Sequence, residues 1–200
     1  MDHIEELAHA FTRLPGIGPR QGKRFVFHLL SLPQAERAKL GELISTLGKD
    51  VHQCPECMRF HNGSATALCR YCSDRSRDDS VLMIVEKDQD LAAVERAGTY
   101  KGRYFVLGGV LTLTGKGVIR ESELIMEVER RLKNGLKEIV LALSATSEGE
   151  HTADRVREVL APYRGRVTIS LLGRGLATGS ELEYSDAETL RAALQNRKET

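Results

Sequence analysis

Apolar runs alternate with amphipathic stretches in the central part of the chain. Four runs, "SVLMIVE", "RYFVLGG", "EIVLALS" and "RVTISLL", lie between residues 80 and 172. They are separated by "DLAAVERAG", "ESELIMEVERRLKNG" and "HTADRVREVLAPY", which have the spacing of amphipathic helices. Continuous apolar strands that alternate with helices are typical of a parallel sheet covered on both faces. The pattern therefore predicts an α/β domain over residues 80–172.

The segments on either side of this domain have different patterns. Residues 1–50 read as helices, "EELAHAFTRL", "RQGKRFVFHLLS" and "PQAERAKLGELISTLGKD", with a break at "PGIGP". Residues 51–75 form a polar stretch that contains every cysteine of the chain, and residues 173–200 hold the turn "GRGLATG" and a last helix, "DAETLRAALQNR". The predicted organisation is an α/β protein of several parts, divided at 1–50, 51–75, 80–172 and 173–200.

Composition narrows the class of protein without indicating a function. Of 200 residues, 41% are hydrophobic and 28% are charged, as in ordinary globular proteins. No apolar run approaches the roughly 18 to 20 residues that span a bilayer. The first residues, "MDHIEELAHAF", have acids where a signal peptide has basic residues. We therefore expect a cytoplasmic protein that does not bind a membrane.

The four cysteines form two C-x-x-C pairs separated by eleven residues: Cys54, Cys57, Cys69 and Cys72. Disulfides rarely persist in the cytosol, and four thiolates satisfy tetrahedral Zn²⁺ without leaving an open position. We expect one structural zinc ion per chain, which would hold a segment too polar to fold on a core of its own. Two disulfides, free thiols or a redox pair are the alternatives. His52 and His61 lie nearby, and we interpret His61 as a loop residue.

A glycine hairpin followed by basic residues is the second informative motif. In "LPGIGPRQGKR" the glycines let backbone N–H groups approach a phosphate, and the next helix carries three basic residues at spacings of three and four. No Asp or Glu occurs from Leu7 to Ala35. This helix–hairpin–helix pattern predicts DNA binding without sequence specificity, and an unliganded helix corner is the alternative. The candidate DNA-binding residues are Gly16, Gly18, Arg20, Lys23 and Arg24.

Acidic residues follow two of the predicted strands. Glu86 ends the first strand, and Glu148 and Glu150 lie in the loop after the third. Because the carboxyl ends of parallel strands share one edge of the sheet, these three carboxylates are candidates for one crevice that holds Mg²⁺. The alternative, which we favour, is that they cap a helix or bind a partner, since no aspartate pair stands in this loop.

The order of these parts resembles the bacterial RecR recombination mediator family along essentially the whole chain. The segments that carry the resemblance are "RLPGIGPRQGKRFVFHLL", the two C-x-x-C pairs followed by "SDRSRD", "VEKDQDLAAVERAGTYKGRYFVLGG" and "GLATGSELEYSDAETLRAAL". The resemblance implies a helix–hairpin–helix over 1–50, a C4 zinc finger over 51–75, a Toprim domain over 80–172 and an oligomerisation segment over 173–200.

The resemblance also implies a function and partners. It implies a ring-shaped homotetramer that clamps DNA and helps RecO, and possibly RecF, to load RecA onto gapped DNA, with no catalytic activity. By the same resemblance the four cysteines match the zinc ligands, Arg20 and Arg24 match DNA-binding positions, and Glu86 matches the single Toprim glutamate. Glu148 and Glu150 match acids that the family uses to contact RecO.

Two other functions remain as alternatives. A metal-dependent Toprim nuclease or primase-like enzyme would need Asp-x-Asp to complete a Mg²⁺ site with Glu86, and Ser, Ala and Thr stand at 144–146. A purely structural zinc scaffold does not explain the basic, acid-free hairpin. The sequence therefore favours a DNA-binding mediator of recombinational repair.

Overall fold

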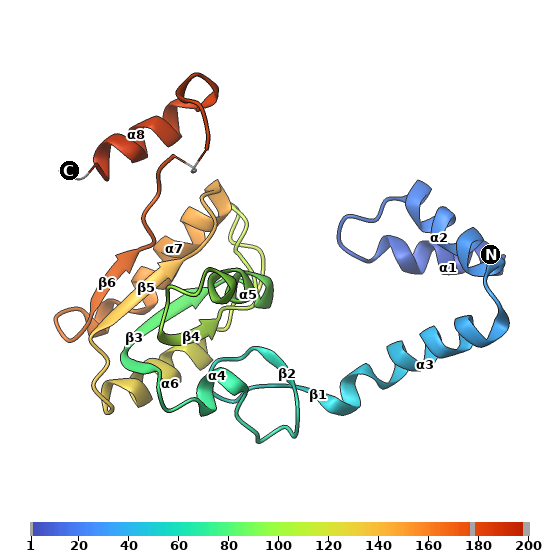
Figure 1. The fold of residues 1–200 in the computed structure, drawn as a ribbon, viewed down its shortest axis with the longest axis horizontal. Coiled ribbons are helices and arrows are strands. Elements are labelled where there is room, and N and C mark those ends of the chain that lie inside the picture. The colour runs from blue at the N-terminus through green and yellow to red at the C-terminus, as the bar shows by residue number, and fades with distance from the viewer. Residues whose placement is uncertain (1, 177–178, 198–200) are drawn as a thin grey trace. The chain divides into compact units, whose positions relative to one another are not determined.

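The computed structural model describes residues 2–176 and 179–197. The chain folds as two compact units that divide between Val51 and His52 (Figure 1). Residues 177–178 and 198–200 of the predicted C-terminal segment lie outside the described residues. None of the helices in the described ranges combines the length and apolar character that a membrane crossing needs.

Three helices make up the first unit: α1 (His3–Thr12), α2 (Pro19–Ser31) and α3 (Gln34–Asp50). The α1 helix begins where the Asp2 carboxylate accepts a hydrogen bond from the Ile4 N–H group at 2.7 Å. The α2 helix begins at Pro19, because proline suits the first helical turn, where its missing N–H group is not needed. These bounds agree with the helices that the sequence pattern predicts for residues 1–50.

Helices α1 and α2 pack closely against each other. Ala8 and Val26 are buried between them, and the rings of Phe11 and Phe25 meet edge to face with centroids 5.7 Å apart. Gly22 allows this approach, because a Cβ atom there would lie 2.6 Å from the backbone oxygen of Ala8. In contrast, α3 buries none of its residues within this chain.

The second unit contains a four-stranded parallel sheet with the strand order β4-β3-β5-β6. Its strands are β3 (Asp78–Val85), β4 (Gly102–Val106), β5 (Glu138–Ala142) and β6 (Thr168–Leu171). Three helices connect them: α5 (Asp88–Ala97), α6 (Glu121–Leu132) and α7 (Ser147–Val159). The predicted α/β domain with a covered parallel sheet is confirmed.

The two faces of the sheet bury different partners. Leu82 and Ile84 of β3 pack on one side with apolar residues of α6 and α7. Met83 and Val85 of the same strand pack on the other side with Leu91 of α5 and with the four cysteines. The cysteine module therefore covers a face of the sheet, and it lacks a core of its own because it shares the core of the sheet.

Smaller elements complete the second unit. In the cysteine module, β1 (Val51–Gln53) pairs with β2 (Phe60–Asn62), and α4 (Arg70–Ser73) follows. Two 3₁₀ turns, η1 (Ala161–Tyr163) and η2 (Leu182–Tyr184), and the final helix α8 (Ala187–Gln195) lie towards the C-terminus. The carboxylate of Asp186 caps α8 by accepting hydrogen bonds from the N–H groups of Glu188 and Thr189.

One helix begins earlier than its predicted position. The sequence pattern placed its start at residue 151, but α7 begins at Ser147. The Thr146 side chain accepts a hydrogen bond from the Gly149 N–H group at 3.1 Å and so caps a helix whose first turn contains Glu148 and Glu150. Gly149 is required there, because a Cβ atom would lie 2.1 Å from the backbone oxygen of Ser144.

Gly22→Ala is expected to loosen the pairing of α1 and α2, because the added methyl group has no room beside the Ala8 carbonyl. Overpacking of this kind costs about 1–3 kcal/mol. Amide hydrogen exchange in the intact protein should show faster exchange in both helices. Gly41→Ala in α3 is the matched control, since nothing lies within 4 Å of its added Cβ atom. Wild-type exchange in Gly22→Ala would contradict this packing.

Candidate functional site

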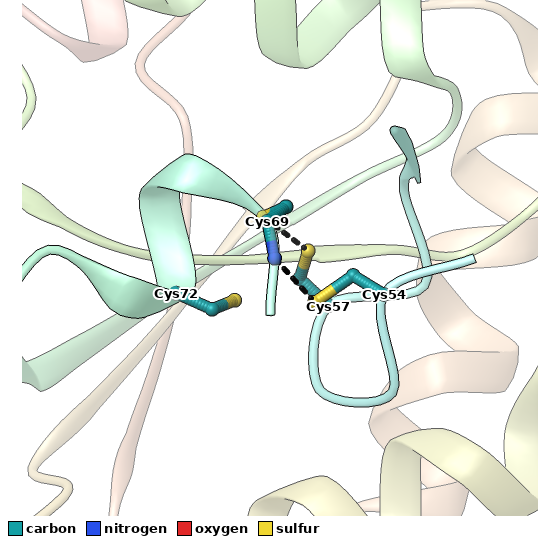
Figure 2. A group of neighbouring side chains, drawn as sticks. All are labelled: Cys54, Cys57, Cys69 and Cys72. Atoms are coloured by element: carbon teal, nitrogen blue, oxygen red, sulfur yellow. Dashed lines mark hydrogen bonds between the residues drawn. The ribbon is translucent and has the colours of Figure 1, made fainter. Parts of the chain in front are cut away.

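The four cysteines come from two short turns. In the first turn the Met58 N–H group donates to the carbonyl oxygen of Cys54 at 2.9 Å, and the Cys54 N–H group donates to the carbonyl oxygen of Arg59 at 2.8 Å. In the second, the N–H group of Cys72 at the start of α4 donates to the carbonyl oxygen of Cys69 at 3.0 Å. All four side chains are buried and converge on one point (Figure 2).

The spacing of the sulfur atoms fits a metal ion. All four lie within 4.8 Å of one another, and the sulfurs of Cys57 and Cys69 are 3.5 Å apart. A disulfide has a bond of about 2.05 Å, and all four cysteines are free thiols, so the predicted alternative of two disulfides is wrong. Metal–sulfur bonds of about 2.3 Å in a tetrahedron place neighbouring sulfurs about 3.8 Å apart. The cluster is therefore a candidate structural metal centre.

No other group of this kind occurs within residues 2–176 and 179–197. His61 is not part of the cluster: its Nδ1 atom lies 3.0 Å from the carbonyl oxygen of Asn62. His61 lies in the short strand β2, so our interpretation of it as a loop residue is corrected.

Hydrogen bonds among the thiols polarise the cluster. Those from Cys57, Cys69 and Cys72 hold the pKa of the Cys54 thiol well below its usual range, while the bond with Cys54 contributes most to raising the pKa of Cys72. A bound divalent ion would deprotonate the thiols that coordinate it.

Hydrogen bonds attach both cysteine turns to the edge strand of the sheet. The carbonyl oxygen of Cys57 accepts from the N–H group of Val106 in β4 at 2.8 Å. The Arg103 side chain, also in β4, donates to the carbonyl oxygens of Tyr71 and Cys72 at 2.9 and 3.1 Å and to Asp79 at 2.7 Å. The cluster is thus continuous with the sheet in hydrogen bonding as well as in packing.

A buried ionic network behind the cluster was missed by sequence reasoning. Glu127 and Arg131 of α6 are 5% and 3% exposed and form an ion pair at 2.5 Å. Arg130 and Arg131 also reach Glu56, which lies inside the first cysteine turn, at 3.0 and 3.5 Å. The available signal was that positions 127 and 131 continue the apolar stripe of Leu124 and Val128, where charged residues are unusual.

The predicted basic residues lie on the exposed surface of α2. Arg20, Lys23 and Arg24 are all exposed, and the single side-chain hydrogen bond among them joins Arg24 to Gln21 at 3.3 Å. The first turn of α2 contains no acid, and Gly18 at its N-cap leaves the N–H groups without a side-chain partner. This surface offers positive charge and free backbone donors, which suits phosphate.

The preceding turn has the backbone that the sequence predicted. Gly16 has a φ of +78°, a value that favours glycine, and nothing lies within 4 Å of the Cβ positions of Gly16 and Gly18. Ile17 is half-buried, and its N–H group donates to the carbonyl oxygen of Leu14 at 3.2 Å. The glycine hairpin therefore leaves its backbone open to a ligand.

The three acids at the edge of the sheet do not form a metal-binding group among the described residues. Glu86 is buried and accepts a hydrogen bond from the Ser144 N–H group at 2.6 Å, which ties the end of β3 to the loop after β5. Glu150 pairs with Arg174 at 2.5 Å, and Glu148 is exposed. The three side chains thus have separate surroundings, in contrast to the single magnesium crevice considered from the sequence.

Comparison with known proteins agrees with this architecture. The family model described as RecR, helix-hairpin-helix, matches residues 4–47, that of the Toprim domain matches residues 80–172, and that of RecR, C-terminal, matches residues 175–198. The Toprim match covers the sheet and its helices.

Curated relatives match over nearly their full length. Recombination protein RecR of Prochlorococcus marinus (strain MIT 9303) is 39% identical over 191 residues, 94% of this chain and 96% of the relative. That of Cutibacterium acnes is 38% identical over 197 residues, 97% and 94% of the two chains, and that of Magnetococcus marinus is 37% identical over 198 residues, 98% and 95%. The chain belongs to the RecR family of recombination proteins.

Proposed function

We propose that this chain is a DNA-binding mediator of recombinational repair that performs no chemistry of its own. Membership of the RecR family supports the role in recombination. The observation that carries DNA binding is the exposed, acid-free basic face of α2 beside an open glycine hairpin. Contacts of this kind bind phosphates, so affinity depends strongly on salt and weakly on sequence.

The proposed assembly is a homotetramer that clamps DNA as a ring. One basic patch per chain is small, and joining several patches in a ring raises the affinity through effective concentration. Exposed apolar side chains support an interface between copies. They occur on α3, at Leu43, Ile44 and Leu47, and in the segment 173–200, at Leu182, Tyr184 and Leu194.

RecO, and possibly RecF, are the proposed protein partners, with the loading of RecA onto gapped DNA as the outcome. Glu148 in the first turn of α7 is exposed and makes no side-chain ion pair within residues 2–176 and 179–197, so it is available to a basic partner surface. Glu150 is half-exposed, and its pair with Arg174 would have to open or be shared in such a contact.

The ion in the cysteine cluster is proposed to be zinc with a purely structural role. Cys54, Cys57, Cys69 and Cys72 would hold it with four thiolates and leave no open position for a substrate. Bound zinc would supply folding free energy.

A metal-dependent Toprim nuclease or primase-like enzyme is the alternative function. Against it, the Glu86 carboxylate is occupied by the Ser144 N–H group, and the loop at 144–146 contains no carboxylate. We propose that Glu86 holds the sheet edge together.

Replacing Cys54 or Cys72 by Ser is expected to release the metal and to lower the stability and yield of the protein, because the module shares its core with the sheet. Elemental analysis of the reduced wild type should give about one zinc per chain. His61→Ser is the control and should keep the metal. A wild type without zinc, or Cys→Ser variants that retain it fully, would refute the assignment.

Replacing both Arg20 and Arg24 by Glu is expected to weaken binding to every DNA sequence tested. The slope of log K against log salt should flatten by roughly 1.8 units per engaged chain on duplex DNA, because each lost phosphate contact removes about 0.9. Titrations at several salt concentrations measure both effects.

Two controls accompany this variant. Lys39→Glu/Lys133→Glu changes the net charge equally at exposed residues elsewhere and should bind nearly as the wild type does. Lys23→Glu should weaken binding less than the Arg pair does if Lys23 flanks the phosphate path. Wild-type affinity and salt slope in the Arg20/Arg24 variant would show that α2 is merely a solvated surface.

No nicking, relaxation or priming is expected when the protein is incubated with Mg²⁺ or Mn²⁺ and supercoiled, linear or gapped DNA. Glu86→Gln should instead lower the free energy of unfolding by about 1–2 kcal/mol, because a charge-assisted hydrogen bond to the Ser144 N–H group is weakened. Denaturant titration measures this loss. Metal-dependent cleavage that disappears in Glu86→Gln would favour the enzyme.

A further inference from the structure

Three arginine side chains surround one tyrosine ring in the cysteine module. The guanidinium carbons of Arg59, Arg70 and Arg77 lie 4.7, 4.7 and 4.9 Å from the centroid of the Tyr71 ring. Each contact is favourable by itself as a cation–π interaction. Three like charges around one ring also repel one another, and carboxylates that pair with the arginines offset this repulsion. The partners of each arginine therefore show whether its charge is neutralised.

Arg77 is the balanced member of the group. Its side chain forms two hydrogen bonds of 2.7 Å with the Glu95 carboxylate and a third of 2.9 Å with the carbonyl oxygen of Gly102. It is therefore part of the packing between Tyr71 and the sheet.

Arg59 lacks such partners. Its side chain is 19% exposed, and its guanidinium makes no hydrogen bond within residues 2–176 and 179–197. The nearest carboxylate oxygen, Oδ1 of Asp88, is 3.9 Å away and already accepts from the N–H group of Phe60 at 2.9 Å. A charge withdrawn this far from water is costly unless an acceptor meets it.

Buried polar atoms without a hydrogen-bond partner are concentrated in this region. Among the described residues, these side-chain atoms are Nε of Arg59, Nε2 of His61 and Nε of Arg77. His61 lies two residues after Arg59, in β2, and Arg77 packs on the same ring as Arg59. The two arginine N–H groups are donors that suit an anion, whereas Nδ1 of His61 faces the carbonyl oxygen of Asn62, so Nε2 of its neutral ring is an acceptor.

Arg70 adds an accessible positive charge. Its side chain is exposed and donates to the Tyr71 hydroxyl at 2.5 Å, and no carboxylate of the described residues lies within ion-pair distance. No Asp or Glu occurs from Cys57 to Ser73, so this is a second acid-free basic stretch of the chain.

The residue that follows Arg59 in the chain is an exposed aromatic residue, Phe60. Phe60 is 51% exposed although its backbone is held by Asp88. Proteins that hold single strands combine exposed aromatic rings, on which bases stack, with cations that meet the phosphates. A duplex keeps its bases stacked inside and cannot use the ring in this way.

The simplest competing explanation is that these arginines offset the charge of a metal–thiolate cluster. Arg103 suits that role, because it donates to the backbone of the cysteine turn at Tyr71 and Cys72. The guanidinium groups of Arg59 and Arg70 donate to no cysteine sulfur in the described chain and instead lie against Tyr71.

We propose that Arg59, Phe60 and Arg70 form a second nucleic-acid site, which binds a phosphate and an adjacent base of a single strand. This inference rests on the proposed function, in which α2 binds DNA, and adds a preference for single-stranded regions. The metal-loaded cysteine module would then serve as a contact surface as well as a structural support.

The test compares the intact, metal-loaded protein on oligothymidylate and on a blunt duplex of the same length. Arg59→Gln/Arg70→Gln is expected to lower single-strand affinity at least tenfold and to flatten the salt slope by roughly 1.4 units per engaged chain, about 0.7 for each phosphate contact on a single strand. Duplex affinity should change less than about twofold. Arg75→Gln/Arg96→Gln, which removes two exposed charges from the same unit, is the matched control.

Phe60→Ala is the second variant, because it leaves every charge in place. Loss of one stacked base should lower single-strand affinity by about fivefold or more with metal content unchanged. If the arginine variant loses its metal, the Phe60→Ala variant becomes the test. A Phe60→Ala protein that binds the single strand as tightly as the wild type does would overturn the proposal. Equal losses on single strand and duplex in either variant would also overturn it.

Two further outcomes distinguish a failure of this site from a failure of the proposed function. If the wild type binds neither the single strand nor the duplex, both the proposed function and this site are wrong. If replacing Arg20 and Arg24 weakens DNA binding but the Arg59/Arg70 and Phe60 variants bind as the wild type does, this site alone is wrong. Poly-glutamate is added as a competing probe. If it binds in an Arg59- and Arg70-dependent manner and oligothymidylate does not, the surface recognises an acidic protein and the nucleic-acid proposal is wrong.

Discussion

The packing of four cysteines against one face of a parallel sheet is the contact on which the larger unit depends. Helices α6 and α7 cover one face of that sheet, and α5 and the cysteine module together cover the other face. Without the module, Met83 and Val85 would lose part of their cover, and the edge strand β4 would lose its bond from Val106 to Cys57. A metal in the cluster would therefore stabilise the sheet as well as the turns that bind it.

The same sheet explains why the acids at its edge differ from a catalytic site. An enzyme on this fold would aim free carboxylates at a metal from the carboxyl ends of the strands. Here Glu86 is used to join β3 to the loop after β5, and Glu150 is paired with Arg174. The surfaces that we propose for binding lie elsewhere, on α2 and on the cysteine module.

Sequence patterns predicted the four strands of the parallel sheet, the longer helices and the cysteine cluster, because each has a local signal: apolar runs, helical spacing and paired cysteines. They did not predict β1, β2 and α4, which are short and polar. They did not predict the distant partners of Arg131, because Glu56 and Asp79 lie 75 and 52 residues from Arg131 along the chain. The position of Glu86 at the end of β3 was predicted, but its partner was not. That partner is the N–H group of Ser144, 58 residues away, and a backbone group has no sequence pattern that identifies it. Long-range contacts of charged side chains require the fold.

If the cysteine cluster binds a metal, the cluster and the sheet should form one cooperative unit. Hydrogen–deuterium exchange of the intact chain, before and after removal of the metal with a chelator, tests it most directly. The turn at residues 54–59 and the amides of β4, including Val106, should lose protection together, while α1 and α2 keep theirs. Loss of protection within residues 51–75 with β4 unchanged would contradict this account.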